Sequence, residues 1–196
     1  MTPFQPRIGR FMLRLISLIL LISWNVRADQ VNYFTSPSKN DLQLVLFSQE
    51  LYVHPERSSG EGIDWQDSLV FTVRTLTNQS SVVICSKSLD YSWKIELWDA
   101  NGKLVPKTRS GASVGKYFER TQIPRTEIRR LEVDPSQEPT MTLVRPSNLF
   151  RISKPGKYTM SITLKVMQLV DKGVALPEPK TILLGPVKIP LRRMED

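Results

Sequence analysis

Several short stretches of the chain alternate strictly between apolar and polar residues. The clearest covers residues 91–98, where one side of an extended backbone carries four apolar side chains: Tyr91, Trp93, Ile95 and Leu97. Trp98 falls on the opposite side. Residues 69–76 and 158–166 show the same period of two. Because successive side chains of a strand point to opposite faces, this pattern predicts β-strands with one buried face.

Pro and Gly interrupt every candidate helix, and no long stretch repeats apolar residues at intervals of three and four. We therefore expect an all-β fold: an immunoglobulin-like antiparallel β-sandwich with two long loops, residues 54–66 and 107–127. Asp99 and Gly102 predict a turn that makes 91–106 a hairpin. The expected strands are 42–53, 69–76, 82–85, 91–98, 103–106, 128–133, 141–144, 158–166 and 182–189, with a bulge or break at Gly185-Pro186, a turn at 171–173 and a loop at Pro177 and Pro179.

The N-terminus has the organisation of a secretory signal peptide. Arg7, Arg10 and Arg14 precede an apolar run of ten residues, which ends at Trp24 and is followed by Val26-Arg27-Ala28. A membrane span needs roughly 20 apolar residues, so we expect cleavage after residue 28 and no span in the mature form; a retained anchor is the alternative. The protein is then exported, periplasmic or secreted, and we expect a bacterial host.

These assignments divide the chain into four parts. Residues 1–28 are the signal peptide, 29–41 an irregular lead-in, 42–191 the β-sandwich domain and 192–196 a tail. Without the first 28 residues the net charge falls from +8 to +4. The high overall basicity is thus no sign of nucleic-acid binding, and nucleic acid is not an expected partner.

Turn and corner residues carry a resemblance to a known fold. Tyr158 follows Pro155-Gly156 at the start of an alternating strand, and Trp93 lies on another. Tyr158 looks like the tyrosine corner of immunoglobulin-like sandwiches, and Trp93 resembles their core Trp. With the Asn78-Gln79-Ser80 and Asp99-Gly102 turns, residues 67–167 resemble bacterial extracytoplasmic immunoglobulin-like domains. A fainter similarity is to BsuPI-type proteinase inhibitor domains. The paired cysteines of antibody domains are missing.

Charge is distributed unevenly along the chain. Residues 29–102 carry a net charge of −5, whereas 103–130 carry +6. We predict that the basic segment binds a partner, an unknown protein or an anionic envelope or polysaccharide surface. Its candidate contacts are Lys103, Lys107, Arg109, Lys116, Arg120, Arg125, Arg129 and Arg130, with Tyr117 and Phe118 adding apolar contact. The alternative is a solvated loop whose cations pair with the acidic N-terminal half.

By strand parity, Trp98 lies on the face opposite Trp93. An exposed Trp beside a hairpin tip is a candidate contact for sugar or protein. The alternative is that a long loop, such as 54–66 with Trp65, covers it.

The sequence offers little equipment for catalysis. His54 is the sole His, at a strand end before Pro55, and no G-x-S-x-G motif occurs. Cys85 is the sole Cys and lies in an apolar strand, so we expect a buried, inert thiol. Glu56, Glu61, Asp64 and Asp67 cluster in and just after one loop, which we expect to be solvated. Neither this loop nor His54 and Cys85 indicates a metal site or a cofactor site. Asn78-Gln79-Ser80 is a glycosylation sequon that matters only in a eukaryotic host.

Together these features predict a non-enzymatic, exported binding or interaction module. One alternative is a proteinase inhibitor that presents a loop to a protease cleft, and another is a hydrolase with an unrecognised site. Open sandwiches have edge strands that can pair with other chains, so the oligomeric state stays open.

Overall fold

In the computed structural model the chain divides into two units, residues 1–30 and Val31–Asp196. The structure describes residues 31–48, 51–53, 69–136 and 142–193, all in the second unit, which is mostly β-structure. Its helical segments are short: α2 (Leu89–Ser92), α3 (Pro146–Leu149) and two 3₁₀ turns, η2 (Gly111–Ser113) and η3 (Arg125–Glu127). Among the described residues no helix has the length and apolar character needed to cross a membrane.

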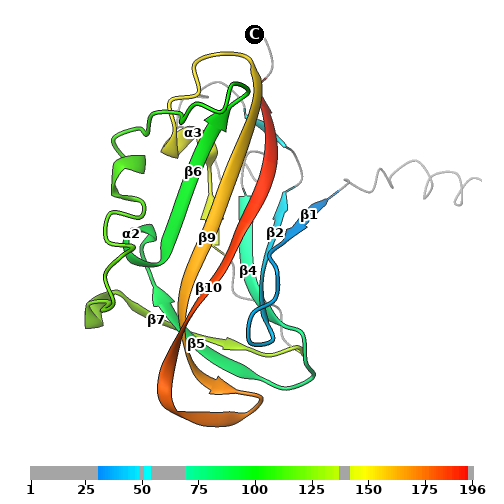
Figure 1. Ribbon diagram of the computed structural model, residues 1–196, viewed down its shortest axis with the longest axis vertical. Coiled ribbons are helices and arrows are strands. Elements are labelled where there is room, and N and C mark those ends of the chain that lie inside the picture. The colour runs from blue at the N-terminus through cyan, green and yellow to red at the C-terminus, as the bar shows by residue number, and fades with distance from the viewer. Residues whose placement is uncertain (1–30, 49–50, 54–68, 137–141, 194–196) are drawn as a thin grey trace, which may run out of the picture. The chain divides into compact units, whose positions relative to one another are not determined.

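The strands form two sheets (Figure 1). The first, sheet A, is fully antiparallel and has four strands in the order β1 (Asn32–Thr35), β2 (Leu42–Ser48), β4 (Leu69–Thr75) and β8 (Thr142–Val144). β1 lies within residues 29–41, so the predicted irregular lead-in is wrong over these four residues. Tyr33 of β1 stands opposite Phe47 of β2, and this cross-strand pairing orders the segment.

The second sheet, sheet B, has the order β3 (Tyr52–Val53), β10 (Val174–Arg193), β9 (Gly156–Asp171), β5 (Ser81–Ser86) and β7 (Ile128–Val133), and β6 (Trp93–Asp99) also pairs with β9. β3 runs parallel to β10, which corrects the purely antiparallel prediction. The predicted strand 42–53 is two strands, β2 and β3, one in each sheet. β10 is longer than predicted: it includes Pro177 and Pro179, where its pairing with β9 is interrupted, and it runs into the expected tail.

β5 and β6 lie one after the other along the same edge of β9. β5 pairs with β9 between Met167 and Val170, and β6 pairs with it between Tyr158 and Leu164. The helical turn α2 separates them, and the Ser86 amide donates a hydrogen bond of 2.7 Å to Ser92 Oγ across this turn. The predicted strand therefore starts at Trp93, and Tyr91, expected on its core face, lies in α2 instead.

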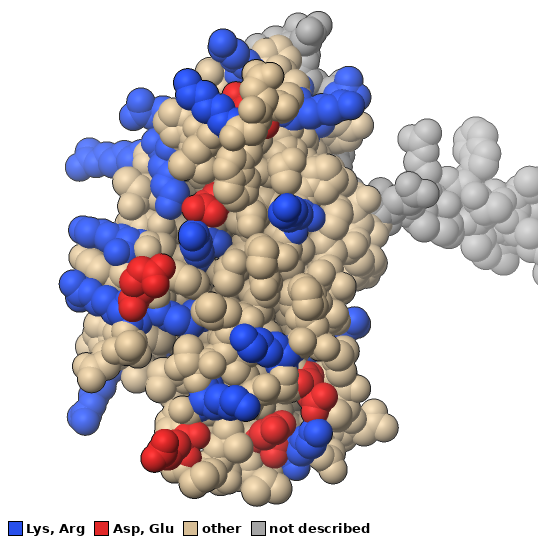
Figure 2. Space-filling model, viewed as in Figure 1, with Lys and Arg blue, Asp and Glu red and all other residues tan. Residues whose placement is uncertain are grey.

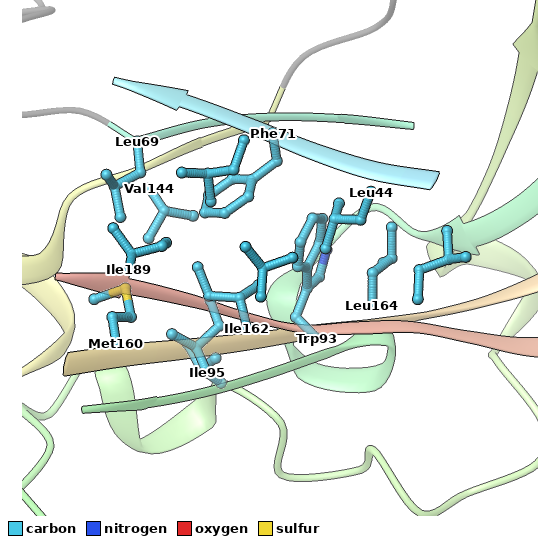
Figure 3. Packing of buried hydrophobic residues seen from close by; sticks show 14 of the residues in the cluster. Leu44, Leu69, Phe71, Trp93, Ile95, Val144, Met160, Ile162, Leu164 and Ile189 are labelled. Atoms are coloured by element: carbon cyan, nitrogen blue, oxygen red, sulfur yellow. The ribbon is translucent and has the colours of Figure 1, made fainter. Parts of the chain in front are cut away.

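One hydrophobic cluster fills the space between the two sheets (Figure 3). Alternate residues of β2 and β4 meet alternate residues of β6, β9 and β10, as period-two burial requires. Phe71 of β4 packs against Trp93 of β6 across the two sheets, with ring centroids 5.1 Å apart. Trp93 is therefore a core residue, as predicted.

Hydrogen bonds fix the two turns that the sequence singled out. Tyr158 is buried, and its hydroxyl donates a 2.6 Å hydrogen bond to the Lys154 carbonyl, four residues upstream. At the end of β6 the Asp99 carboxylate accepts hydrogen bonds from the amides of Asn101 and Lys103. The chain then returns through a single bridge, Trp98 to Leu104, so the predicted hairpin is present although its second arm is not a regular strand.

Candidate functional site

Residues 107–121, here called the strap, lie across the outer face of sheet B. Two lysine side chains hold the strap in place. Lys107 Nζ donates a 2.7 Å hydrogen bond to the Val114 carbonyl within the strap, and Lys165 of β9 donates to the carbonyls of Phe118 and Arg120. The Phe118 side chain is buried, with Lys165 Nζ 4.9 Å from its ring centroid. Partial burial lowers the pKa of both lysines, and nearby glutamates, Glu96 and Glu119 respectively, oppose this shift.

Two glycines let the strap approach its neighbours closely. A Cβ on Gly111 would stand 1.9 Å from the Leu149 carbonyl oxygen, and one on Gly115 would stand 2.9 Å from that of Trp93. Gly115 also has a φ of +74°, which favours glycine. Its amide donates to the Leu89 carbonyl, so the strap is joined to α2 as well as to β9.

The eight candidate cations differ in exposure. Lys103, Arg109, Lys116, Arg120, Arg125 and Arg130 are exposed, whereas Lys107 and Arg129 are half-buried. Lys107 is a poor contact residue because its ammonium is used inside the strap. Arg129 lies opposite Cys85 in the β5–β7 pair. Six of the eight predicted side chains are thus exposed to solvent.

The exposed cations of residues 103–130 lack acidic partners in the described part of the chain. The two ion pairs there are Lys94–Glu96, at 3.7 Å, and Lys172–Asp41, at 2.7 Å. Neither includes a cation of the basic segment, so among the described residues no charge pairing with the N-terminal half accounts for it. Most acidic residues of that half lie outside the described residues. Figure 2, in the view of Figure 1, shows Lys and Arg side chains along the edge where the strap (green in Figure 1) runs.

An aromatic cluster supports part of this basic surface. Tyr117 packs against Tyr91 of α2, with ring centroids 4.9 Å apart and planes 31° apart. The Arg120 guanidinium lies 4.3 Å from the Tyr117 ring centroid, and Lys116 Nζ lies 5.2 Å from it. Strand parity had placed Tyr91 in the core, so sequence reasoning missed its role here. It also missed Lys165, because the carbonyls that this residue bonds lie 45 or more positions away.

Two hollows lie between the strap and sheet B. One of about 320 Å³ is lined by Leu104, Val114 and Phe150 among others, and one of about 230 Å³ by Ile123, Met167 and Leu183 among others. Phe118 and Glu119 border both. The strap therefore has an apolar underside and a basic exposed surface.

Trp98 is half-buried on the outer face of β6, where it pairs with Thr159 of β9. It is therefore not a bare aromatic surface. The loop that was expected to cover it, residues 54–66, lies outside the described residues.

Among the described residues, the remaining candidates give no reactive cluster. Cys85 is buried, as expected, and burial raises its pKa to about 11, although Arg129 partly opposes this. His54 and the acidic residues between 56 and 67 lie outside the described residues. Within the described ranges no three His, Cys, Asp or Glu side chains come together in a way that could hold a metal ion. Asn78 of the sequon is exposed.

No protein-family model, curated protein or solved structure matches the chain.

Proposed function

We propose that this chain is an exported, non-catalytic binding module built on an immunoglobulin-like sandwich, and that its strap binds anionic polymers of the cell envelope. Two observations support the fold proposal. A four-stranded sheet, β1-β2-β4-β8, packs against a second sheet in the order β3-β10-β9-β5-β7, with β6 also paired to β9, and two packed sheets of this kind are compatible with such a sandwich. The Tyr158 hydroxyl makes the backward hydrogen bond of a tyrosine corner.

One observation carries the functional proposal: six exposed cations, on a braced segment and its flanks, lack acidic partners among the described residues. Cations that served only solubility would need no braced backbone. The two lysine ammoniums and the close-packed glycines hold this segment in one conformation, which lowers the entropy lost on binding. Exposed charge of one sign also speeds encounter with an anionic partner.

Neutralisation of the basic surface tests the proposal. The test variant replaces Lys103, Lys116, Arg125 and Arg130 by Gln, and the control variant replaces Lys39, Arg74, Lys154 and Lys157, which are exposed elsewhere. Binding to polygalacturonate and to polyphosphate is measured by calorimetry over a range of NaCl concentrations, with neutral dextran as the blank.

We expect the test variant to bind at least about tenfold more weakly and to show a shallower salt dependence, because fewer counterions are released. The control variant, with the same loss of net charge, should lose about twofold or less. Equal losses in the two variants would show that net charge alone drives binding, and the basic surface of the strap and its flanks would then have no special role.

The proteinase-inhibitor alternative stays a prediction. Incubation of the pure protein with a panel of serine proteases tests it, and inhibition at micromolar protein would favour it over polymer binding.

A further inference from the structure

The arginine that lies on the aromatic cluster differs from the other cations of the strap. Arg120 is exposed, and its guanidinium lies 4.3 Å from the centroid of the Tyr117 ring. Tyr91, which belongs to α2, also packs against the Tyr117 ring. No ion pair of the described residues uses the Arg120 side chain, and its backbone carbonyl is the acceptor for Lys165. Arg109 is also exposed and belongs to the same strap, but no aromatic ring of the described residues is stacked with it.

A guanidinium that lies on an aromatic ring keeps its N–H groups available in the plane of the group. Those N–H groups match two oxygens of one carboxylate or phosphate, which they bind through two parallel hydrogen bonds. Stacking on Tyr117 also reduces the number of side-chain conformations that binding must freeze. A lysine at the same position would keep the charge but not the paired donors.

The local charges suit a single anionic group. Lys116 Nζ lies 5.2 Å from the centroid of the same ring, and Lys165 Nζ donates a hydrogen bond to the Arg120 carbonyl. Glu119 is one acidic neighbour; it is exposed and borders the 230 Å³ hollow together with Arg120 and Lys165. Asp90 of α2 is a second, because its carbonyl accepts a hydrogen bond from the Tyr117 amide. The three cations, Arg120, Lys116 and Lys165, outnumber these two carboxylates.

We propose that Arg120, positioned by the Tyr91–Tyr117 pair, is the specificity-determining residue of the strap, and that it binds one carboxylate or phosphate group of the polymer through a two-oxygen contact. This inference rests on the proposed function, which requires only that the strap be basic. It adds that recognition depends on the geometry of one guanidinium.

Charge-conserving substitutions distinguish recognition by charge alone from recognition by the guanidinium of Arg120. Arg120→Lys is compared with Arg109→Lys, and Tyr117→Leu with Tyr117→Phe, by calorimetry on polygalacturonate, which carries carboxylates, and on polyphosphate. The Arg120 carbonyl is present in every variant, so the Lys165 anchor is kept. Circular dichroism and thermal unfolding confirm that each variant is folded.

We expect Arg120→Lys to weaken binding about tenfold at every salt concentration without changing the salt dependence, because the charge is conserved. Arg109→Lys should change binding about twofold or less. Tyr117→Leu should reproduce the loss and Tyr117→Phe should not, because only the first removes the ring. The polymer whose affinity falls identifies the group, carboxylate or phosphate, that Arg120 contacts.

Two results would overturn the inference. If Arg120→Lys binds both polymers as the wild type does, while the fourfold neutralised variant loses binding, the surface recognises charge only and the proposed function survives alone. If the wild type binds neither polymer, both proposals fail.

Discussion

Single residues on this surface divide into those that hold the strap and those that remain exposed. Lys107 and Lys165 donate to strap carbonyls, so their charge is used to position backbone. Arg120 and Lys116 lie against the Tyr117 ring and keep their donors exposed. Residues of the same chemical type thus have different roles, which depend on the carbonyl or ring that the fold brings near each.

Cys85 gives a prediction at this scale. Burial raises its pKa from 9.0 to about 11. The folded thiol therefore stays neutral between pH 9 and 11, whereas the thiol of the unfolded chain ionises. The unfolded state binds fewer protons in this window, so the free energy of unfolding falls as pH rises through it.

We expect the wild type to lose about 2 kcal/mol of stability between pH 9 and 11 relative to Cys85→Val, which has no thiol to ionise. Urea denaturation of both proteins at several pH values measures the difference. A disulfide reagent at pH 8 should modify Cys85 only after denaturant is added. Rapid modification of the folded protein, or parallel pH profiles for the two proteins, would contradict the burial.

At the scale of elements, the strap depends on close approach to the segment before β9. Gly111 packs against the backbone of Leu149, at the end of α3, and the Thr108 amide donates to the Leu149 carbonyl. Backbone cannot move aside as the end of a flexible side chain can. A methyl group at this position must therefore displace one end of the strap.

Gly111→Ala should accordingly lower the free energy of unfolding by about 2 kcal/mol or more. Trypsin should also cleave the strap faster, at the exposed Arg109 and Lys116. Gly102→Ala is the control: its φ is +75°, but an added Cβ meets nothing within 4 Å, so only the backbone strain of about 1 kcal/mol applies. Equal effects of the two substitutions would show that the approach to Leu149 does not hold the strap.

The sequence predicted those elements whose signal is local. Alternation identified β4, β6 and β9, because a strand with one buried face has apolar residues at every second position. It failed at Tyr91, since parity holds only while the backbone is extended, and a hydrogen bond between Ser86 and Ser92 turns it there. The basic segment was visible as composition. The attachment of this segment to β9 was not, because Lys165 and the carbonyl of Arg120 to which it donates are 45 positions apart in the sequence.

At the scale of the whole described unit, the basic strap lies on the outside of sheet B and the hydrophobic core on the inside. β6 and β9 contribute to both sides: Trp93 and Leu164 face the core, whereas Lys94 and Lys165 lie on the outer face. The docking of sheet A on sheet B therefore stabilises the same strands that position the strap. Loss of core packing is expected to weaken polymer binding indirectly.

A double-mutant cycle across the core tests whether the two sheets stabilise each other through the Phe71–Trp93 contact. Both side chains are buried, and their rings meet at 59° with centroids 5.1 Å apart. Phe71→Leu and Trp93→Leu keep the positions apolar but remove the aromatic pair. We expect their effects on the free energy of unfolding to be non-additive by about 1 kcal/mol.

Tyr33→Leu combined with Trp93→Leu is the matched control, since Tyr33 is 68% exposed and its ring packs with Phe47 rather than with Trp93. That pair should be additive to within about 0.5 kcal/mol. Additivity of the Phe71 and Trp93 substitutions to the same limit would mean that the sheets dock without this contact. The joining of sheet A to the strands beneath the strap would then have to depend on the aliphatic residues of β2 and β10 instead.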